Sequence, residues 1–143
     1  MRYSHIVFDI DGTLTDTFLP LMQSLSDTVH HFLGVRMGPE ELRFAFGITS
    51  FDTYDRLGIE DKQAAGAYWQ SRFEVHGKGI ELFPGIVDTL HQLRDMDCVL
   101  AIITSKSYFE LMDSFTPFGL NELFLLAITA DDTQEHKPHP APM

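Results

Sequence analysis

Residues 5–16 read His-Ile-Val-Phe-Asp-Ile-Asp-Gly-Thr-Leu-Thr-Asp, and the fold follows from this stretch. The run from His5 to Ile10 is apolar at almost every position and contains β-branched residues, a pattern typical of a strand covered on both faces in a parallel sheet. Ligands of open α/β sheets bind at the carboxyl ends of the strands, and Asp9 lies at that end. A carboxylate there indicates a role in binding or catalysis.

The second acid, Asp11, extends this interpretation. Side chains two residues apart can be turned toward one cavity when a glycine such as Gly12 lets the chain bend sharply. Asp9 could then attack an electrophile, while Asp11 protonates the leaving group and later deprotonates water. Both carboxylates are also oxygen ligands of the kind that Mg²⁺ prefers. The alternative is that Asp-Gly is ordinary turn chemistry and that Thr13 and Asp16 cap the next helix.

Two further strands are expected at 98–103 and 125–129, and about ninety residues between the first two strands have helical patterns. Helices are expected over 18–32 with a cap at Gly34, from Pro39-Glu40-Glu41, and over 51–57 and 64–73. Two more, over 86–96 and 108–115, flank the second strand. The sequence therefore predicts an α/β fold, with a Rossmann-like parallel-sheet core at 1–15 and 82–143 and an inserted helical subdomain at 16–81.

Composition excludes several classes of function. The 143 residues carry 10 Lys and Arg against 21 Asp and Glu, a net charge of −11, so neither nucleic acid nor an anionic membrane surface is expected as a partner. Apolar runs reach six residues, far short of the ~18 needed for a membrane span, and the first strand leaves no room for a signal peptide. The single cysteine, Cys98, is expected to be a buried apolar residue. A soluble, cytoplasmic protein is the resulting expectation.

The stretch from Asp9 to Asp16 resembles the haloacid dehalogenase superfamily of phosphatases and phosphotransferases, whose first motif reads Asp-x-Asp-Gly-Thr-Leu-x-Asp. The resemblance implies an aspartyl-phosphate intermediate on Asp9 and acid–base work by Asp11. It also implies Mg²⁺ held by the Asp9 carboxylate and the Asp11 main-chain carbonyl, with Gly12 and Thr13 in the phosphate-binding loop. The dehalogenating branch does not retain the second acid, so Asp11 favours phosphoryl transfer.

Two later segments are similar to the second and third motifs of that family. Thr104 and Ser105 follow the second strand, where a hydroxyl and a backbone N–H can bind a phosphoryl oxygen, although an ordinary helix cap is the alternative. Their neighbour Lys106 is expected to be solvated rather than to contact a ligand. Lys137, in Lys-Pro-His-Pro, resembles the lysine that neutralises the phosphoryl group, and its prolines are expected to keep the backbone extended. His136 and His139 are too few for a transition-metal site.

The family's fourth motif is a pair of acids beyond the lysine, which would complete the Mg²⁺ site. Asp131 and Asp132 precede Lys137 and are expected to form a polar loop instead. The resemblance covers about two thirds of a usual member, so the sequence suggests a product truncated at its C-terminus. Weaker Mg²⁺ binding and self-association through an exposed sheet edge would follow.

The helical insert resembles the cap of the phosphoglycolate phosphatase branch, which includes pyrophosphatases and β-phosphoglucomutases. Residues 44–50 are a candidate loop for inspecting substrate, and an ordinary interhelical turn is an equal alternative. The expected function is a Mg²⁺-dependent phosphatase for a small phosphorylated metabolite, a phosphomonoester similar to phosphoglycolate. A sugar phosphomutase and a truncated, noncatalytic binding module are the alternatives.

Overall fold

The computed structural model describes residues 3–143 and contains a sheet of three parallel strands. Strands β1 (His5–Phe8), β2 (Val99–Ile103) and β3 (Leu126–Ile128) lie in the order β1-β2-β3. The register pairs His5 with Val99, and Ala101 with Leu126. All three strands run in the same direction, so their carboxyl ends meet at one edge of the sheet. The predicted parallel α/β core is confirmed.

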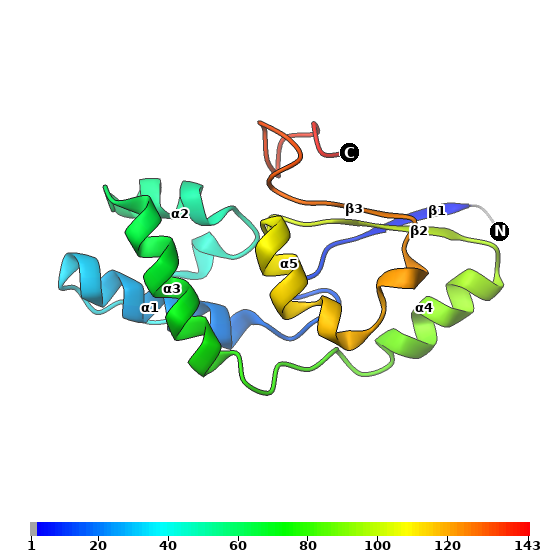
Figure 1. Cartoon of the computed structure of the whole chain (residues 1–143), viewed down its shortest axis with the longest axis horizontal. Helices are drawn as coiled ribbons and strands as arrows, with labels where there is room; N and C mark the ends of the chain where they lie inside the picture. Colours follow the sequence, from blue (N-terminus) through cyan, green and yellow to red (C-terminus); the bar gives the residue numbers. More distant parts are fainter. Residues whose placement is uncertain (1–2) are drawn as a thin grey trace. The chain divides into compact units, whose positions relative to one another are not determined.

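The chain divides into two compact units, of which the first contains the sheet. This unit comprises the described residues up to Thr15 together with Leu82–Met143. Its helices are α4 (Ile86–Asp95) and α5 (Tyr108–Ser114), with the short 3-10 turns η2 (Thr116–Phe118) and η3 (Asn121–Leu123) between α5 and β3. Figure 1 shows these helices on one side of the strands. The core between them is built from Ile10, Leu14, Leu90, Cys98, Leu100, Ile102, Leu111, Phe115 and Leu120.

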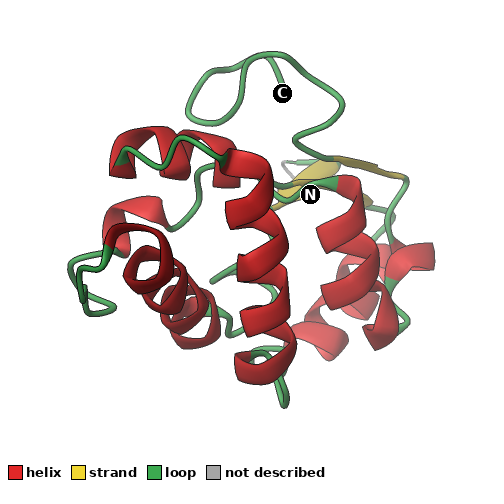
Figure 2. Cartoon of the chain, turned by 60° about the vertical axis from the view of Figure 1, so that its left-hand side comes forward, coloured by secondary structure: helices red, strands yellow, loops and turns green. Residues whose placement is uncertain are grey.

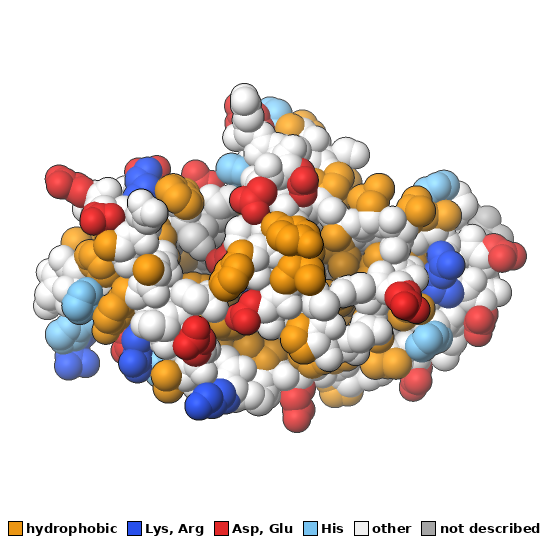
Figure 3. Space-filling view, in the orientation of Figure 1, with side chains coloured by type: hydrophobic (Ala, Val, Ile, Leu, Met, Phe, Trp, Pro, Cys, Tyr) orange, Lys and Arg blue, Asp and Glu red, His pale blue; other side chains and the backbone are white. Residues whose placement is uncertain are grey.

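The expectation that the strands are covered on both faces is wrong for the described residues. Leu100 points into the core and is fully buried, whereas Val7 is 45% exposed and Leu126 is 46% exposed. Successive side chains of a strand point to opposite faces, and α4 and α5 cover only one of them. Hydrophobic side chains also gather on the outer surface over α5 (Figure 3), where Tyr108 and Phe109 are exposed.

The second unit, Asp16–Glu81, is fully described and contains helices and loops but no β-strand (Figure 2). Its helices are α1 (Phe18–Leu33), α2 (Ser50–Leu57) and α3 (Lys62–His76), with a 3-10 turn η1 (Arg43–Ala45). They enclose a separate core of Met22, Leu25, Val29, Leu42, Ala45, Tyr54, Ile59, Ala65, Trp69 and Phe73. No helix among the described residues is long and apolar enough to cross a membrane.

The helix expected from Pro39 is wrong, because the chain makes turns over 39–42 before the short η1. The Glu41 carboxylate turns back to accept a hydrogen bond from the Gly38 N–H at 2.8 Å. Gly47 then adopts a φ of 90°, which ends the segment. The segment therefore forms turns and a single 3-10 turn instead of an α-helix.

The two chain segments that connect the units, residues 14–16 and 81–83, are joined by backbone hydrogen bonds. Thr15 and Leu82 form an isolated antiparallel bridge, and the Phe83 N–H donates to the Leu14 carbonyl at 3.0 Å. One residue further on, the Asp16 N–H donates to the Glu81 carbonyl, also at 3.0 Å. The chain therefore leaves the sheet-containing unit and returns to it at neighbouring points.

A charged cluster joins α1 to α3 within the helical unit. The Oδ2 atom of Asp27 accepts hydrogen bonds from Arg72 Nε at 2.8 Å and from His76 Nε2 at 2.9 Å. The hydrogen bond from His76, assisted by Arg72, lowers the pKa of the Asp27 carboxyl below its ordinary value. Because this pKa is lower in the folded state, the pairing stabilises the fold above the unfolded-state pKa and is lost as the pH falls.

We therefore expect Asp27→Asn to lower the free energy of unfolding by about 0.5 kcal/mol at pH 7, a small value because the group is partly exposed. The difference from wild type should shrink below the ordinary carboxyl pKa of 3.8. Urea denaturation at pH 7 and near pH 3 measures both quantities. Glu74→Gln, at an exposed position of α3, is the control and should show no such pH dependence. An Asp27→Asn effect that grows on acidification would contradict the assignment.

Candidate active site

A tight turn directly after β1 places the two aspartates. The carbonyl oxygen of Ile10 accepts hydrogen bonds from the backbone N–H groups of Thr13, Leu14 and Thr15 at 2.8 to 3.1 Å. Gly12 has a φ of 73°, in the left-handed region that favours glycine. The predicted sharp bend at Gly12 is confirmed. Neither Thr13 nor Asp16 caps the next helix, since Thr17 is the N-cap of α1 and makes no side-chain cap bond.

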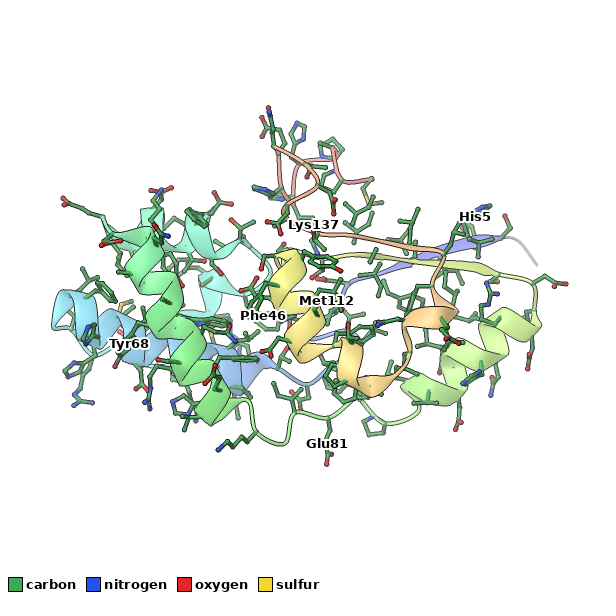
Figure 4. The ribbon with its side chains drawn as sticks, in the orientation of Figure 1. His5, Phe46, Tyr68, Glu81, Met112 and Lys137 are labelled. Atoms are coloured by element: carbon green, nitrogen blue, oxygen red, sulfur yellow. The ribbon has the colours of Figure 1, made fainter. Side chains whose placement is uncertain are left out.

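Asp9 is paired with a lysine from the far end of the chain. Its Oδ1 atom lies 2.9 Å from Lys137 Nζ and also accepts a hydrogen bond from the Ile10 N–H at 2.8 Å. Lys137 Nζ donates in addition to the carbonyl of Ile103, the last residue of β2, at 3.1 Å. In Figure 4 the labelled Lys137 lies on the loop after β3 and points toward the sheet. One ammonium group thus connects the ends of two strands.

The backbone around Lys137 is not extended as expected. Residues 136–139 form a turn closed by a hydrogen bond from the His139 N–H to the His136 carbonyl at 2.8 Å, and the Lys137–Pro138 peptide bond is cis. The missing N–H of proline does not prevent this turn, because the closing bond uses the N–H of His139. The ring of His136 contacts the Ala130 carbonyl at 3.0 Å, which ties the turn to the end of β3.

Asp11 is paired with a second lysine that sequence reasoning assigned to solvent. Lys106 is only 5% exposed, and its Nζ lies 3.2 Å from Asp11 Oδ1. The expectation of a solvated Lys106 is therefore wrong. Its aliphatic stem is buried beside the sheet and its charge is matched by a carboxylate, which is the condition under which a lysine can be buried.

Thr104 and Ser105 lie where the second motif was expected, directly after β2. Thr104 is buried, and its hydroxyl accepts a hydrogen bond from the Lys106 N–H at 3.2 Å. The alternative that this pair caps the following helix is wrong, because Ser107 is the N-cap of α5 and forms a capping box with Glu110. Ser105 is half-buried, whereas Gly12 and Thr13 are exposed at the same edge of the sheet. Their binding roles remain predictions.

The residues at this edge suit a hard cation only in part. The Ile10 N–H and Lys137 Nζ both contact the Oδ1 atom of Asp9, so within the described chain its Oδ2 atom is left for another ligand. The Asp11 carboxylate, the second at this edge, contacts Lys106. No group of three or more potential ligands occurs among residues 3–143. Asp132 is occupied by the N–H and hydroxyl of Thr129, which lower its pKa, and so belongs to the predicted polar loop. The Asp9 carboxylate is chemically suited to Mg²⁺ if the Asp11 main-chain carbonyl, water and ligand oxygens supply the rest.

A parallel α/β sheet with paired acids after its first strand and a lysine from a later loop defines a class of phosphoryl-transfer folds. The profile of the haloacid dehalogenase-like hydrolases matches residues 6–143. The chain belongs to this family.

Known proteins support this assignment over the whole chain. Pyrophosphatase PpaX from Halalkalibacterium halodurans is 28% identical over 144 residues, covering 100% of this chain and 67% of the relative. PpaX from Bacillus pumilus is 29% identical, covering 96% of this chain and 64% of the relative. The chain thus spans about two thirds of the length of these relatives.

Solved structures agree with the fold. A Lactobacillus plantarum protein assigned as a phosphoglycolate phosphatase superposes with a TM-score of 0.79 at 28% identity, covering 99% of this chain and 69% of that one. CbbY from Rhodobacter sphaeroides, in complex with phosphate, gives a TM-score of 0.78 at 22% identity over the same shares of the two chains. The α/β fold is therefore shared with proteins of quite different sequence.

Sequence reasoning missed Lys106, although one signal could have found it. Asp9 and Asp11 follow β1 with a spacing of two residues, and Thr104 and Lys106 follow β2 with the same spacing. Parallel strands in register bring such positions to the same edge. A polar residue that repeats this spacing after the neighbouring strand is therefore a candidate partner for Asp11.

The turn at Gly12 gives a prediction about stability. Gly12→Ala forces a side chain into the left-handed region and should destabilise the protein by about 1–2 kcal/mol. Gly66→Ala is the matched control, because Gly66 lies inside α3 with no heavy atom near the added Cβ. That change should stabilise by about 0.5–1 kcal/mol. Thermal or urea denaturation measures both, and equal effects of the two substitutions would contradict the backbone argument.

Proposed function

We propose that this protein is a Mg²⁺-dependent phosphatase that hydrolyses a small phosphomonoester through an aspartyl-phosphate on Asp9. The observation that carries the proposal is the environment of Asp9. Its Oδ1 is held by Lys137 and by the Ile10 N–H, so the carboxylate has a fixed orientation at the carboxyl end of β1. A nucleophile must be oriented in this way to attack phosphorus in line with the leaving group.

Each remaining residue has a defined task in the proposed reaction. Lys137 offsets part of the repulsion between Asp9 and the phosphoryl oxygens. Thr104 and Ser105 offer hydroxyl and backbone N–H donors to those oxygens without adding negative charge. Asp11 transfers a proton to the leaving oxygen in the first step and takes one from water in the second. Gly12 and Thr13 shape the loop that receives the phosphoryl group.

The charges at the site explain why a cation is included. The formal charges of Asp9 and Asp11 as carboxylates, the state that Asp11 reaches once it has given its proton to the leaving group, are matched by those of Lys106 and Lys137. A phosphate dianion would bring an excess of negative charge into this group. Mg²⁺ held by Asp9 and Asp11 would supply the missing charge and polarise the phosphoryl oxygens.

The helical unit, residues 16–81, is proposed as the cap that selects the leaving group. Its length and position after the first motif are those expected for the phosphoglycolate phosphatase branch. The relatives named as pyrophosphatase favour pyrophosphate as a second candidate substrate beside small phosphomonoesters. Phosphoglycolate, pyrophosphate and p-nitrophenyl phosphate therefore belong in one substrate panel.

We expect Asp9→Asn to lower phosphate release by at least about 100-fold, because the amide cannot act as the nucleophile. The measurement is Mg²⁺-dependent phosphate release from the panel, with and without EDTA. Asp95→Asn is the control, since Asp95 is an exposed acid at the end of α4. The assay is run on the 143-residue chain and on a chimaera that adds the segment of PpaX beyond the matched region.

Trapping experiments separate this proposal from its alternatives. Beryllofluoride with Mg²⁺ should bind the wild-type protein and protect it against thermal unfolding, and Asp9→Asn should abolish the protection. Phosphoryl transfer to a hexose phosphate instead of water would favour a phosphomutase. Turnover and trapping that are both insensitive to Asp9→Asn in the chimaera would refute the covalent route and favour a noncatalytic module.

A further inference from the structure

We propose that Lys106 is a positioning residue for Asp11, holding its carboxylate so that it can take a proton from water when the aspartyl-phosphate is hydrolysed. This inference rests on the proposed function and adds to it a second lysine with a separate task. Its basis is the contact between Lys106 Nζ and Asp11 Oδ1 at 3.2 Å, made by a lysine that is 5% exposed.

The backbone of Lys106 is anchored on both sides, which makes its side chain a fixed support. Its N–H donates to the Thr104 hydroxyl at 3.2 Å, at the end of β2. Its carbonyl accepts a hydrogen bond from the Ala130 N–H at 2.8 Å, just beyond β3. With the side chain on Asp11, the single residue Lys106 connects the loops that follow all three strands. A buried ammonium group on a backbone that is held at two points fixes the direction of its partner carboxylate.

The two lysines differ in what they hold. Lys137 Nζ lies 2.9 Å from Asp9 Oδ1, and its second partner is the backbone carbonyl of Ile103. Lys137 is half-buried and comes from a loop, whereas Lys106 is buried and directly follows a strand. Lys137 therefore serves the carboxylate proposed to attack phosphorus, and Lys106 serves the carboxylate proposed to move protons.

The chemical step that depends on Lys106 is the second one. An oxygen of water attacks the phosphorus of the aspartyl-phosphate, the bond between phosphorus and Asp9 oxygen breaks, and the Asp9 carboxylate is restored. The proton lost by water passes to an Asp11 carboxylate oxygen, and inorganic phosphate leaves. Without Lys106 the Asp11 carboxylate loses the contact that helps to set its direction, so this step slows while the attack by Asp9 continues.

A substrate with a good leaving group isolates that step. With p-nitrophenyl phosphate the departing nitrophenolate needs little help from an acid, so kcat/KM reports phosphorylation of Asp9. The value of kcat then reports hydrolysis of the aspartyl-phosphate. We expect Lys106→Met to lower kcat by about 10- to 100-fold. The change in kcat/KM should stay below about threefold, with KM falling in parallel and acid-quenched phosphoenzyme accumulating.

Three further variants make the test specific. Lys106→Arg keeps the charge and should recover much of kcat. In an Asp11→Asn background, Lys106→Met should have little additional effect on kcat, because its partner is already disabled. Lys78→Met removes an exposed lysine and should leave both constants unchanged. If Lys106→Met fails to fold, as judged by its melting temperature, Lys106→Gln replaces it with the same expected separation of kcat from kcat/KM.

The outcomes separate this inference from the proposed function. Equal losses in kcat and kcat/KM would assign Lys106 to binding the phosphoryl group or to holding the fold, and would overturn the positioning role. Unchanged constants would overturn it as well. Wild-type turnover that does not require Asp9 would refute the proposed function itself. All variants are made in the form of the protein that shows phosphatase turnover without any substitution, either the 143-residue chain or the chimaera.

Discussion

Two carboxylates at the end of one strand repel each other, and the rest of this site is arranged around that repulsion. Asp9 and Asp11 are held within one tight turn by the Ile10 carbonyl and by Gly12. Like charges confined in this way raise the energy of the folded state unless cations lie beside them. Lys137 contacts the first carboxylate and Lys106 contacts the second. Each acid therefore has a basic partner of its own.

The need for these partners explains connections that the local sequence does not. Lys137 reaches back from beyond β3 and also binds the end of β2, so the last described loop is attached to the sheet through the charges it neutralises. Lys106 joins the loops after all three strands through its side chain, its N–H and its carbonyl. The carboxyl edge of the sheet is consequently cross-linked by polar contacts.

Much of this architecture follows from local patterns. Consecutive apolar residues identified the strands, and helical spacing identified α1, α2, α3, α4 and α5. This works because a helix that buries one face repeats its apolar residues with the helical period. Asp9, Thr104 and Lys137 were placed at strand ends or in a loop by motif and position. The structure brings Asp9 and Lys137 into contact, although what either residue does stays a proposal.

Three of the errors arose where one specific polar contact decides the outcome. Burial of Lys106 depends on Asp11, which lies in the turn after β1, so a charged residue after β2 carries no local sign of its environment. The turn at His136 and the missing helix at Pro39 depend on single hydrogen bonds to specific carbonyl or carboxylate acceptors. The sequence of β1 could not predict that one face of the sheet is exposed. An apolar run shows that a strand can be buried, but it does not show that a helix covers each face.

The paired passages between the two units have a consequence for how such proteins can diversify. Because the Asp16 N–H contacts the Glu81 carbonyl, the helical segment begins and ends at almost the same point in space. An insertion with touching ends can be excised, lengthened or exchanged for another without stretching the host chain. The sheet and its acidic turn would then stay unchanged, and recombination at two adjacent backbone positions would suffice to exchange the helical unit for another one.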